Sequence, residues 1–385
     1  MYDDSGRYSS MGRFQTVDEE TIRSGGCTDI YFVRSGEVLE TDQKNPRVVM
    51  EVTAGTLPDA WAIFCGLNDV VSLLEGVPVD LDAMPEGTVF LAREPVMRIS
   101  GRYRDFARYE TAILGFLCHA SGIASAAAHI RCVAGDRRVY SFGSRRQHPA
   151  IAAMVERSAW IGGVDGASNT AAPEGIPLAG TMPHAFVMCY PRPADAFRAF
   201  ALHAPAGVPR IMLCDTFCDE KRESLAAAGV GAEGVRLDTP RSRRGDMREI
   251  LEEVRWELDS AGYPQVDIFL SGGVNREDIV RYRDIVGAFG VGGAIANAPV
   301  IDFAMDIVER EGVHCAKRGK RGGVKQVYRM PSGERVLLPA AREPPAGGTP
   351  LLLPFVRNGE VVREADMGEA RRRVLSAIPG LSGSS

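Results

Sequence analysis

Apolar runs alternate with amphipathic segments four times between Arg210 and Val308. The runs, each with the polar or glycine-rich residues that end it, are IMLCDT (211–216), VRLDTPRSRRG (235–245), VDIFLSGG (266–273) and AFGVGGAI (288–295). This order predicts consecutive βα units, which build a parallel sheet or barrel. Because ligands bind where the strands of such folds end and the helices begin, we expect the four ends to form one site.

The segment after the second run has the clearest helical pattern in the chain. Apolar residues recur along it at spacings of three and four, at Met247, Ile250, Leu251, Val254 and Leu258. This spacing predicts a helix that buries one face against a sheet, as expected in a βα barrel.

The N-terminal region shows a different pattern. TDIYFVRS (28–35), RVVMEVTA (47–54) and GTVFLAREPVMRIS (87–100) are strand-like, and WAIFCGLNDVVSLLEG (61–76) is helical. Together they predict an α+β layer rather than repeated βα units. Residues 109–130, rich in Ala, Leu and Ile, predict a largely buried helix.

Composition sets limits on location and partners. The 385 residues are 45% hydrophobic and 25% charged, which fits a globular protein of two or three domains. No run approaches the length of a membrane span, and the polar N-terminus has no apolar signal segment, so a cytoplasmic location without membrane contact is expected. The formal net charge of −5 argues against nucleic acid as the main partner. The eight cysteines form no CxxC pair, which favours reduced thiols.

Two glycine pairs end the last two predicted strands, Gly272 with Gly273 and Gly292 with Gly293. Glycine lets an oxyanion approach the backbone N–H groups at the start of a helix. Such pairs on the last strands of a barrel are typical of a site for one phosphomonoester, although simple tight turns have the same sequence.

Asp215 and Asp238 end the first two strands, and a threonine follows each. A carboxylate there can bind ribose hydroxyls, hold Mg²⁺ or stabilise positive charge on a sugar carbon; a helix cap is the alternative. Arginines are clustered beside turns at Arg145 and Arg146, and again within 241–244. Since the sequence contains no nucleophile motif, these groups fit phosphoribosyl transfer, in which a ring nitrogen displaces pyrophosphate.

Six segments carry a family resemblance. In their order along the chain, RYRDFARYETAILGF, SFGSRRQHPAI, GTMPHAF, VRLDTPRSRRG, SGGVNRE and FGVGG closely resemble the motifs of nicotinate phosphoribosyltransferases, particularly the archaeal type. The resemblance implies the type II phosphoribosyltransferase fold, which combines an α/β sandwich domain with an incomplete (β/α) barrel. It also implies a homodimer, or a larger homo-oligomer, that shares active sites between subunits.

The implied division of the chain is a flexible lead-in over 1–22, a sandwich domain over 23–108, a barrel domain over 109–311 and a small C-terminal domain over 312–385. Archaeal relatives hold zinc in this last domain, but here Met330 stands where the first ligand is expected and no cysteine follows Cys315. Zinc needs about four N or S ligands, so no zinc is expected.

The resemblance assigns the base pocket to residues outside the four strand ends. Phe142 matches the aromatic residue that stacks on the pyridine ring, and Tyr31 matches its counterpart from the other subunit. Arg145 and Arg146 match the arginines that bind phosphoribosyl pyrophosphate (PRPP) or the nicotinate carboxylate, in an order left open. Thr181 would line the pocket.

The sugar phosphate and the catalytic roles follow from the same motifs. Arg236 and Asp238 match contacts to ribose and phosphate, and the four glycines match the cradle of the 5′-phosphate. His184 lies where ATP-stimulated relatives carry a histidine that becomes phosphorylated; a purely structural histidine is the alternative. The candidate catalytic residues are therefore Asp215, Asp238 and His184.

The implied reaction joins nicotinate to PRPP, which brings Mg²⁺, and yields nicotinate mononucleotide and pyrophosphate. Coupling to ATP is left open, and no metal held by the protein alone is expected. Quinolinate phosphoribosyltransferase is the alternative with the same fold, but its second carboxylate needs cations that GTMPHAF lacks. An inert sensor of NAD precursors is the alternative from another class, and the intact arginine and aspartate positions argue against it.

Overall fold

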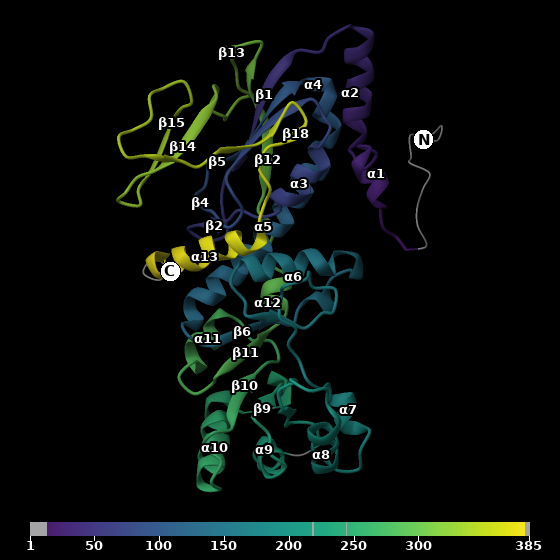
Figure 1. Ribbon diagram of the computed structural model, residues 1–385, viewed down its shortest axis with the longest axis vertical. Coiled ribbons are helices and arrows are strands. Elements are labelled where there is room, and N and C mark those ends of the chain that lie inside the picture. The colour runs from purple at the N-terminus through teal and green to yellow at the C-terminus, as the bar shows by residue number, and fades with distance from the viewer. Residues whose placement is uncertain (1–13, 218, 244, 382–385) are drawn as a thin grey trace. The chain divides into compact units, whose positions relative to one another are not determined.

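The computed structural model describes residues 14–217, 219–243 and 245–381, which form two compact units (Figure 1). Of the described residues, the sheet unit contains 14–125 together with Pro299–Ala377. The barrel unit contains Ala126–Ala298 and residues 378–381.

The barrel unit is built on a curled sheet of parallel strands in the order β7-β6-β11-β10-β9-β8, which confirms an incomplete barrel. The strands are β6 Arg138–Ser141, β7 Gly166–Ala167, β8 Ile211–Leu213, β9 Gly234–Leu237, β10 Asp267–Leu270 and β11 Ala288–Val291. Because neighbouring strands are parallel, their carboxyl ends lie at one edge of the sheet.

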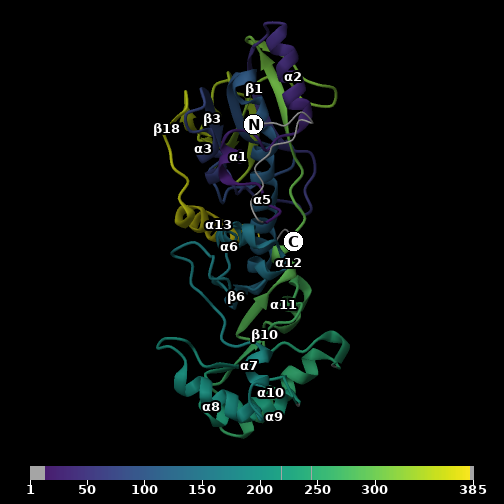
Figure 2. The same cartoon turned by 90° about the vertical axis from the view of Figure 1, so that its right-hand side faces the viewer.

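A helix follows each of the last four strands, as the four apolar runs predict. These helices are α9 Glu220–Gly229, α10 Met247–Ser260, α11 Arg276–Tyr282 and α12 Gly293–Ala296. Helix α9 contacts both α10 and α8, Pro193–His203, so that the three lie side by side (Figure 2). The predicted helix face is confirmed, because α10 buries Met247, Leu251, Val254 and Leu258.

The sheet unit contains a seven-stranded antiparallel sheet in the order β13-β12-β1-β5-β3-β17-β18. The strands are β1 Arg47–Ala54, β3 Val79–Ala83, β5 Pro95–Arg102, β12 Phe303–Arg310, β13 Val313–His314, β17 Leu353–Arg357 and β18 Glu360–Val361. Helix α3, Leu67–Leu74, buries its apolar side chains in the same core as β1 and β5.

Both ends of the chain contribute to this sheet. Strand β12 pairs with β1, and β17 pairs with β3. The contacts therefore join residues 299–377 to the N-terminal segment, whereas the division from the sequence placed 312–385 in a separate domain. Pairing between segments so far apart has no local signature in a sequence, which is why that division differs. The remaining C-terminal elements are β14 Lys325–Arg329, β15 Arg335–Pro339, β16 Thr349–Pro350 and α13 Met367–Leu381.

Two local predictions in the sheet unit are wrong. Residues 28–35 form no strand, because helix α2 spans Ile30–Thr41 and buries none of its side chains. Within the predicted helix 61–76 only α3 is helical, and β2, Ala62–Ile63, pairs instead with β4, Val89–Phe90. A short apolar alternation fits both a strand and an exposed helix, so tertiary contacts decide between them.

The apolar stretch 109–130 is confirmed as a helix, α5, Glu110–Ala134. With α4, Tyr103–Phe106, and the short 3-10 helix that follows it, residues 103–134 are long and apolar enough to cross a membrane by length and composition, which corrects the expectation that no run approaches a span. The most apolar window is 67% buried inside the structure, as in the core helix of a globular protein. Within the predicted lead-in, helix α1 begins at Glu19, and residues 1–13 lie outside the described residues.

Candidate active site

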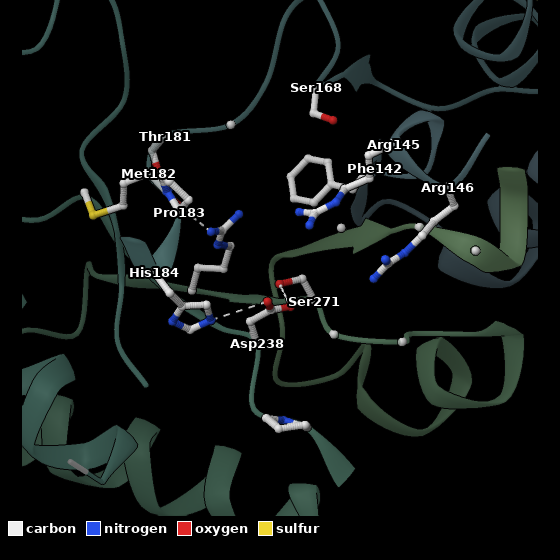
Figure 3. A pocket seen from close by; sticks show the side chains of 18 of the residues that line it. Phe142, Arg145, Arg146, Ser168, Thr181, Met182, Pro183, His184, Asp238 and Ser271 are labelled. Carbon is white, nitrogen blue, oxygen red and sulfur yellow. Dashed lines mark hydrogen bonds and ion pairs between the residues drawn. The ribbon is translucent and has the colours of Figure 1, made fainter. Parts of the chain in front are cut away.

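A cavity of about 960 Å³ opens at the carboxyl ends of the barrel strands (Figure 3). All of the predicted site residues line it except Asp215 and Tyr31, namely Phe142, Arg145, Arg146, Thr181, His184, Arg236, Asp238, Gly272, Gly273, Gly292 and Gly293. Three of the four predicted strand ends and the separate SFGSRR and GTMPHAF segments therefore line one cavity, and the first strand end reaches it only through the contact of Asp215 with Asp238.

The two strand-end aspartates are linked to each other. The Asp215 side chain is only 2% exposed, and its Oδ2 accepts the N–H of Asp238 at 2.8 Å and the hydroxyl of Thr239 at 2.9 Å. Asp238 is 34% exposed and accepts the Ser271 hydroxyl at 2.8 Å. Burial raises the pKa of Asp215 despite these hydrogen bonds. Asp215 therefore supports Asp238 from beneath, and Asp238 faces the cavity.

His184 begins the short helix α7, His184–Met188, and lies against both aspartates. Its Nδ1 is 3.1 Å from the Thr216 hydroxyl, and its Nε2 is 3.6 Å from Asp238 Oδ2 and 3.9 Å from Asp215 Oδ1. These last two distances are too long for direct hydrogen bonds. They place an imidazole beside two carboxylates, of which Asp238 faces the cavity (Figure 3).

The Phe142 ring fits because glycine occupies position 290. A Cβ on Gly290 would lie 2.6 Å from two carbon atoms of that ring. The Arg236 guanidinium lies 5.9 Å from the ring centroid and donates to the Met182 carbonyl at 2.6 Å. Burial lowers the pKa of Arg236, yet arginine remains charged at neutral pH, so a cation lies beside the aromatic ring.

Arg145 and Arg146 form a short turn after β6, and both are exposed to the cavity (Figure 3). The next residue, Gln147, donates to the Ala296 carbonyl at 2.7 Å and to Asn297 Oδ1 at 2.9 Å. A Cβ on Gly143 would lie 2.4 Å from the Gly292 carbonyl oxygen. The turn is thus packed directly against the glycine turn of β11.

The two glycine pairs differ in conformation. Gly272 and Gly273 have φ of +87° and +81°, which side chains disfavour, and a Cβ on Gly272 would lie 2.8 Å from the Asp238 carbonyl oxygen. Gly292 has φ −99°, and Gly293 begins α12. The backbone conformation of the first pair therefore requires glycine. In the second pair, the absence of a side chain leaves the backbone open to the cavity.

Thr181 and Tyr31 make contacts that the sequence did not predict. The Thr181 hydroxyl lines the cavity but donates to the Ile211 carbonyl at 2.5 Å, so it also holds its segment against β8. Tyr31 belongs to α2 in the sheet unit, is 58% exposed, and donates to Asp29 at 3.1 Å. This hydrogen bond raises the pKa of Tyr31.

Several supporting residues had no signal in the sequence. Glu223, buried in α9, accepts the N–H groups of Thr216 at 2.9 Å and Phe217 at 2.7 Å, which holds the loop after Asp215. Gly290 and Gln147 likewise act through contacts between segments distant in the chain. Only the position of α9 directly after that loop could have suggested Glu223.

The family models that match the chain describe two domains of one enzyme family. The model of the quinolinate phosphoribosyl transferase N-terminal domain matches residues 29–121, and that of the C-terminal domain matches residues 123–306. Among curated relatives, a nicotinate phosphoribosyltransferase of Mycobacterium tuberculosis is 31% identical over 79% of this chain and 72% of its own length. A nicotinate phosphoribosyltransferase of Bacillus subtilis is 27% identical over 70% of this chain and 63% of its own length.

Two solved structures are similar to this chain over nearly its whole length. The nicotinate-nucleotide pyrophosphorylase of Pyrococcus furiosus is similar with a TM-score of 0.94 and 47% identity, over 96% of this chain and 98% of that one. Human nicotinic acid phosphoribosyltransferase is similar in fold, with a TM-score of 0.77 and 21% identity, over 91% of this chain and 93% of that one.

Proposed function

Because the chain belongs to the nicotinate phosphoribosyltransferase family, we propose that it transfers the phosphoribosyl group of PRPP to nicotinate and releases pyrophosphate. The observation that carries this proposal is the single cavity in which an aromatic ring, two exposed arginines, two glycine turns and a strand-end carboxylate converge. These are the groups needed for a pyridine ring, for anions, for a phosphomonoester and for a cationic sugar carbon.

The base site is centred on Phe142. The pyridine ring stacks on its exposed face, beside the Arg236 cation. Arg145 and Arg146 supply charge-assisted hydrogen bonds to the nicotinate carboxylate and to PRPP, and arginine suits both because its planar fork matches two oxygens at once. Thr181 closes one wall of this pocket.

The sugar phosphate occupies the strand ends. Backbone N–H groups of the two glycine turns hold the 5′-phosphate, and Asp238 binds the ribose hydroxyls. The nicotinate nitrogen then forms a bond to C1′ while the bond from C1′ to the pyrophosphate oxygen breaks, and no proton has to move. Positive charge develops on the sugar, and the carboxylates of Asp238 and Asp215 stabilise it.

The aspartates also suit the Mg²⁺ that accompanies PRPP. Within the described part of the chain, the buried Oδ1 of Asp215 has no hydrogen-bond partner, and no three His, Cys, Asp or Glu side chains group into a metal site. Mg²⁺ is commonly held by one or two carboxylates together with substrate phosphates, so Asp215 and Asp238 would hold it with the substrate. When bound, it neutralises charge on the departing pyrophosphate.

His184 is proposed as the residue through which ATP acts. Its imidazole is 39% exposed and lies beside the two carboxylates, so a phosphoryl group on it would lie near the pyrophosphate site. ATP is expected to stimulate the wild type and not His184→Ala. Absence of stimulation in both proteins would remove the phosphohistidine from the mechanism.

Quinolinate is the competing acceptor, because the matching family models carry that name. Its second carboxylate needs a further cation near the base. Arg241 also lines the cavity, but it is paired with Asp278 at 2.7 Å, and the segment 180–183 supplies none. This distribution of charge favours the monocarboxylate.

One assay separates the acceptors. Purified protein is supplied with PRPP and Mg²⁺ and with nicotinate, quinolinate or nicotinamide separately, with and without ATP, and mononucleotide is followed by chromatography. We expect product from nicotinate. Product from quinolinate alone, with release of CO₂, would overturn the proposal.

We also propose a cytoplasmic homodimer in which Tyr31 completes the base pocket of the second subunit. The exposure of Tyr31 on a helix that buries no side chain supports this role. Mixed dimers of Tyr31→Ala and Phe142→Ala each contain one intact site, so activity should return when the two inactive proteins are unfolded and refolded together. No recovery would contradict the shared site.

A further inference from the structure

A buried carboxylate lies behind the arginine turn. Glu156, on helix α6 (Ala152–Ile161), is 0% exposed, and neither of its carboxylate oxygens has a partner of full hydrogen-bond geometry among the described residues. The hydroxyls of Ser141 and Ser144 nevertheless face it and favour its charged form, while burial outweighs them and raises the pKa of Glu156. Helix α6 also contacts the turn Ser144–Arg146 directly.

Two other buried glutamates are satisfied by the backbone, and the buried Glu51 is paired with Lys325 at 2.8 Å. Glu94 accepts the N–H of Leu91 at 3.0 Å, and Glu223 accepts two N–H groups. A carboxylate without such partners costs free energy when buried, and groups of this kind are concentrated at functional sites. Glu156 lies behind the arginine turn, so a role at the neighbouring site would explain why a buried carboxylate is kept there despite its free-energy cost.

The two serines have hydroxyl protons to give to Glu156. Ser144 Oγ accepts a hydrogen bond from Asn169 Nδ2 at 2.9 Å, which leaves its own proton available. Ser141 Oγ is buried and has no partner within the described residues. Ser141 ends β6 and Ser144 begins the arginine turn, so the two hydroxyls bracket Phe142 and Gly143.

We propose that Glu156 is a positioning residue for substrate binding: through Ser141 and Ser144 it fixes the turn that presents Arg145 and Arg146 to the anionic substrate. Gln147, bonded to the Ala296 carbonyl, and Gly143, packed against the Gly292 carbonyl, hold the same turn. The inference rests on the proposed function, because that function gives the two arginines their anions. Glu156 touches no substrate itself.

The test compares Glu156→Leu with Glu156→Gln. The leucine removes both acceptor oxygens, so the KM for the substrate that Arg146 binds should rise about tenfold or more, as expected for hydrogen bonds to a charged group, with kcat little changed. The same substrate should be affected in Arg146→Lys. The glutamine keeps one acceptor oxygen for the serines and should restore most of the affinity. Glu94→Gln, at a buried carboxylate of the sheet unit, is the matched control and should leave both KM values unchanged.

Three results overturn the inference: wild-type KM values in Glu156→Leu, a defect that glutamine does not relieve, or an equal loss for both substrates that follows a fall in melting temperature. If Glu156→Leu fails to fold, the double variant Ser141→Ala, Ser144→Ala removes the donors instead and should reproduce the KM defect. Wild-type protein that makes no mononucleotide from nicotinate refutes the proposed function alone, and binding of PRPP measured by calorimetry then still tests Glu156.

Discussion

The barrel unit and the sheet unit assemble their sheets in opposite ways. Strands β8 to β11 follow one another in the chain, and each is followed by its own helix. In the sheet unit, by contrast, β1 pairs with β12 and β3 with β17. The two catalytic aspartates of the barrel unit therefore come from consecutive strand ends, whereas the sheet unit depends on long-range pairing. Changes in the first should alter chemistry, and changes in the second should alter stability.

The largest effect is expected at Asp238. Asp238→Ala removes the carboxylate that faces the cavity, so turnover should fall about a thousandfold, the scale of losing one preorganised electrostatic group. The fold should persist, because this side chain is 34% exposed. Steady-state kinetics and a thermal melt measure the two effects. Arg145→Ala should behave in the same way, and near-normal kinetics in either variant would refute the role of that residue.

A smaller loss of activity is expected from Gly290→Ala. Its Cβ would lie 2.6 Å from the Phe142 ring and must displace it. The KM for nicotinate should rise about tenfold, equivalent to ~1.4 kcal/mol. Gly229→Ala is the control, since a Cβ there meets nothing within 4 Å. An unchanged KM in Gly290→Ala would remove Phe142 from the base pocket.

The sheet unit provides the opposite test at Asp82. Its carboxylate pairs with Arg98 of β5 and with Arg357 of β17, and so connects an N-terminal strand to a C-terminal one. Asp82→Ala removes the carboxylate partner of both arginines, so the free energy of unfolding should fall by about 3 kcal/mol. Urea denaturation measures this loss. Activity per folded molecule should stay at the wild-type level, and a specific loss of kcat would weaken the contrast between the units.

The smallest effect concerns pH. Burial first, and then the nearby Asp306 and Asp29, raise the pKa of Glu110 from an ordinary value of 4.5 to about 7, although the Lys317 cation acts to lower it. The folded protein therefore favours the protonated form, and this stabilisation is full below pH 4.5 and is lost as the pH rises toward 7. Glu110→Gln should flatten that part of the stability profile. An identical slope in both proteins would show that Glu110 titrates normally.

Much of the candidate site could be predicted from the sequence, because aspartates and paired glycines stand where the predicted strands end. Asp215, Asp238 and Gly272 lie within two residues of the end of an apolar strand, and the conformation of Gly272 and Gly273 is one that other residues avoid. The segment holding Tyr31 shows the limit of such reasoning. Its alternation resembles a strand, but it forms an exposed helix, because no neighbouring strand pairs with it.

The sequence by itself determined the order of the βα units and which side chains stand at their ends, since both follow from local periodicity and from the conformational freedom of glycine. Only the tertiary structure decided how those ends act together. Parallel pairing places Asp215 beneath Asp238 and Gly290 opposite Phe142, and the packing of α6 places Glu156 behind the arginine turn. These relations depend on distances between segments far apart in the chain, and such distances exist only after the strands have paired.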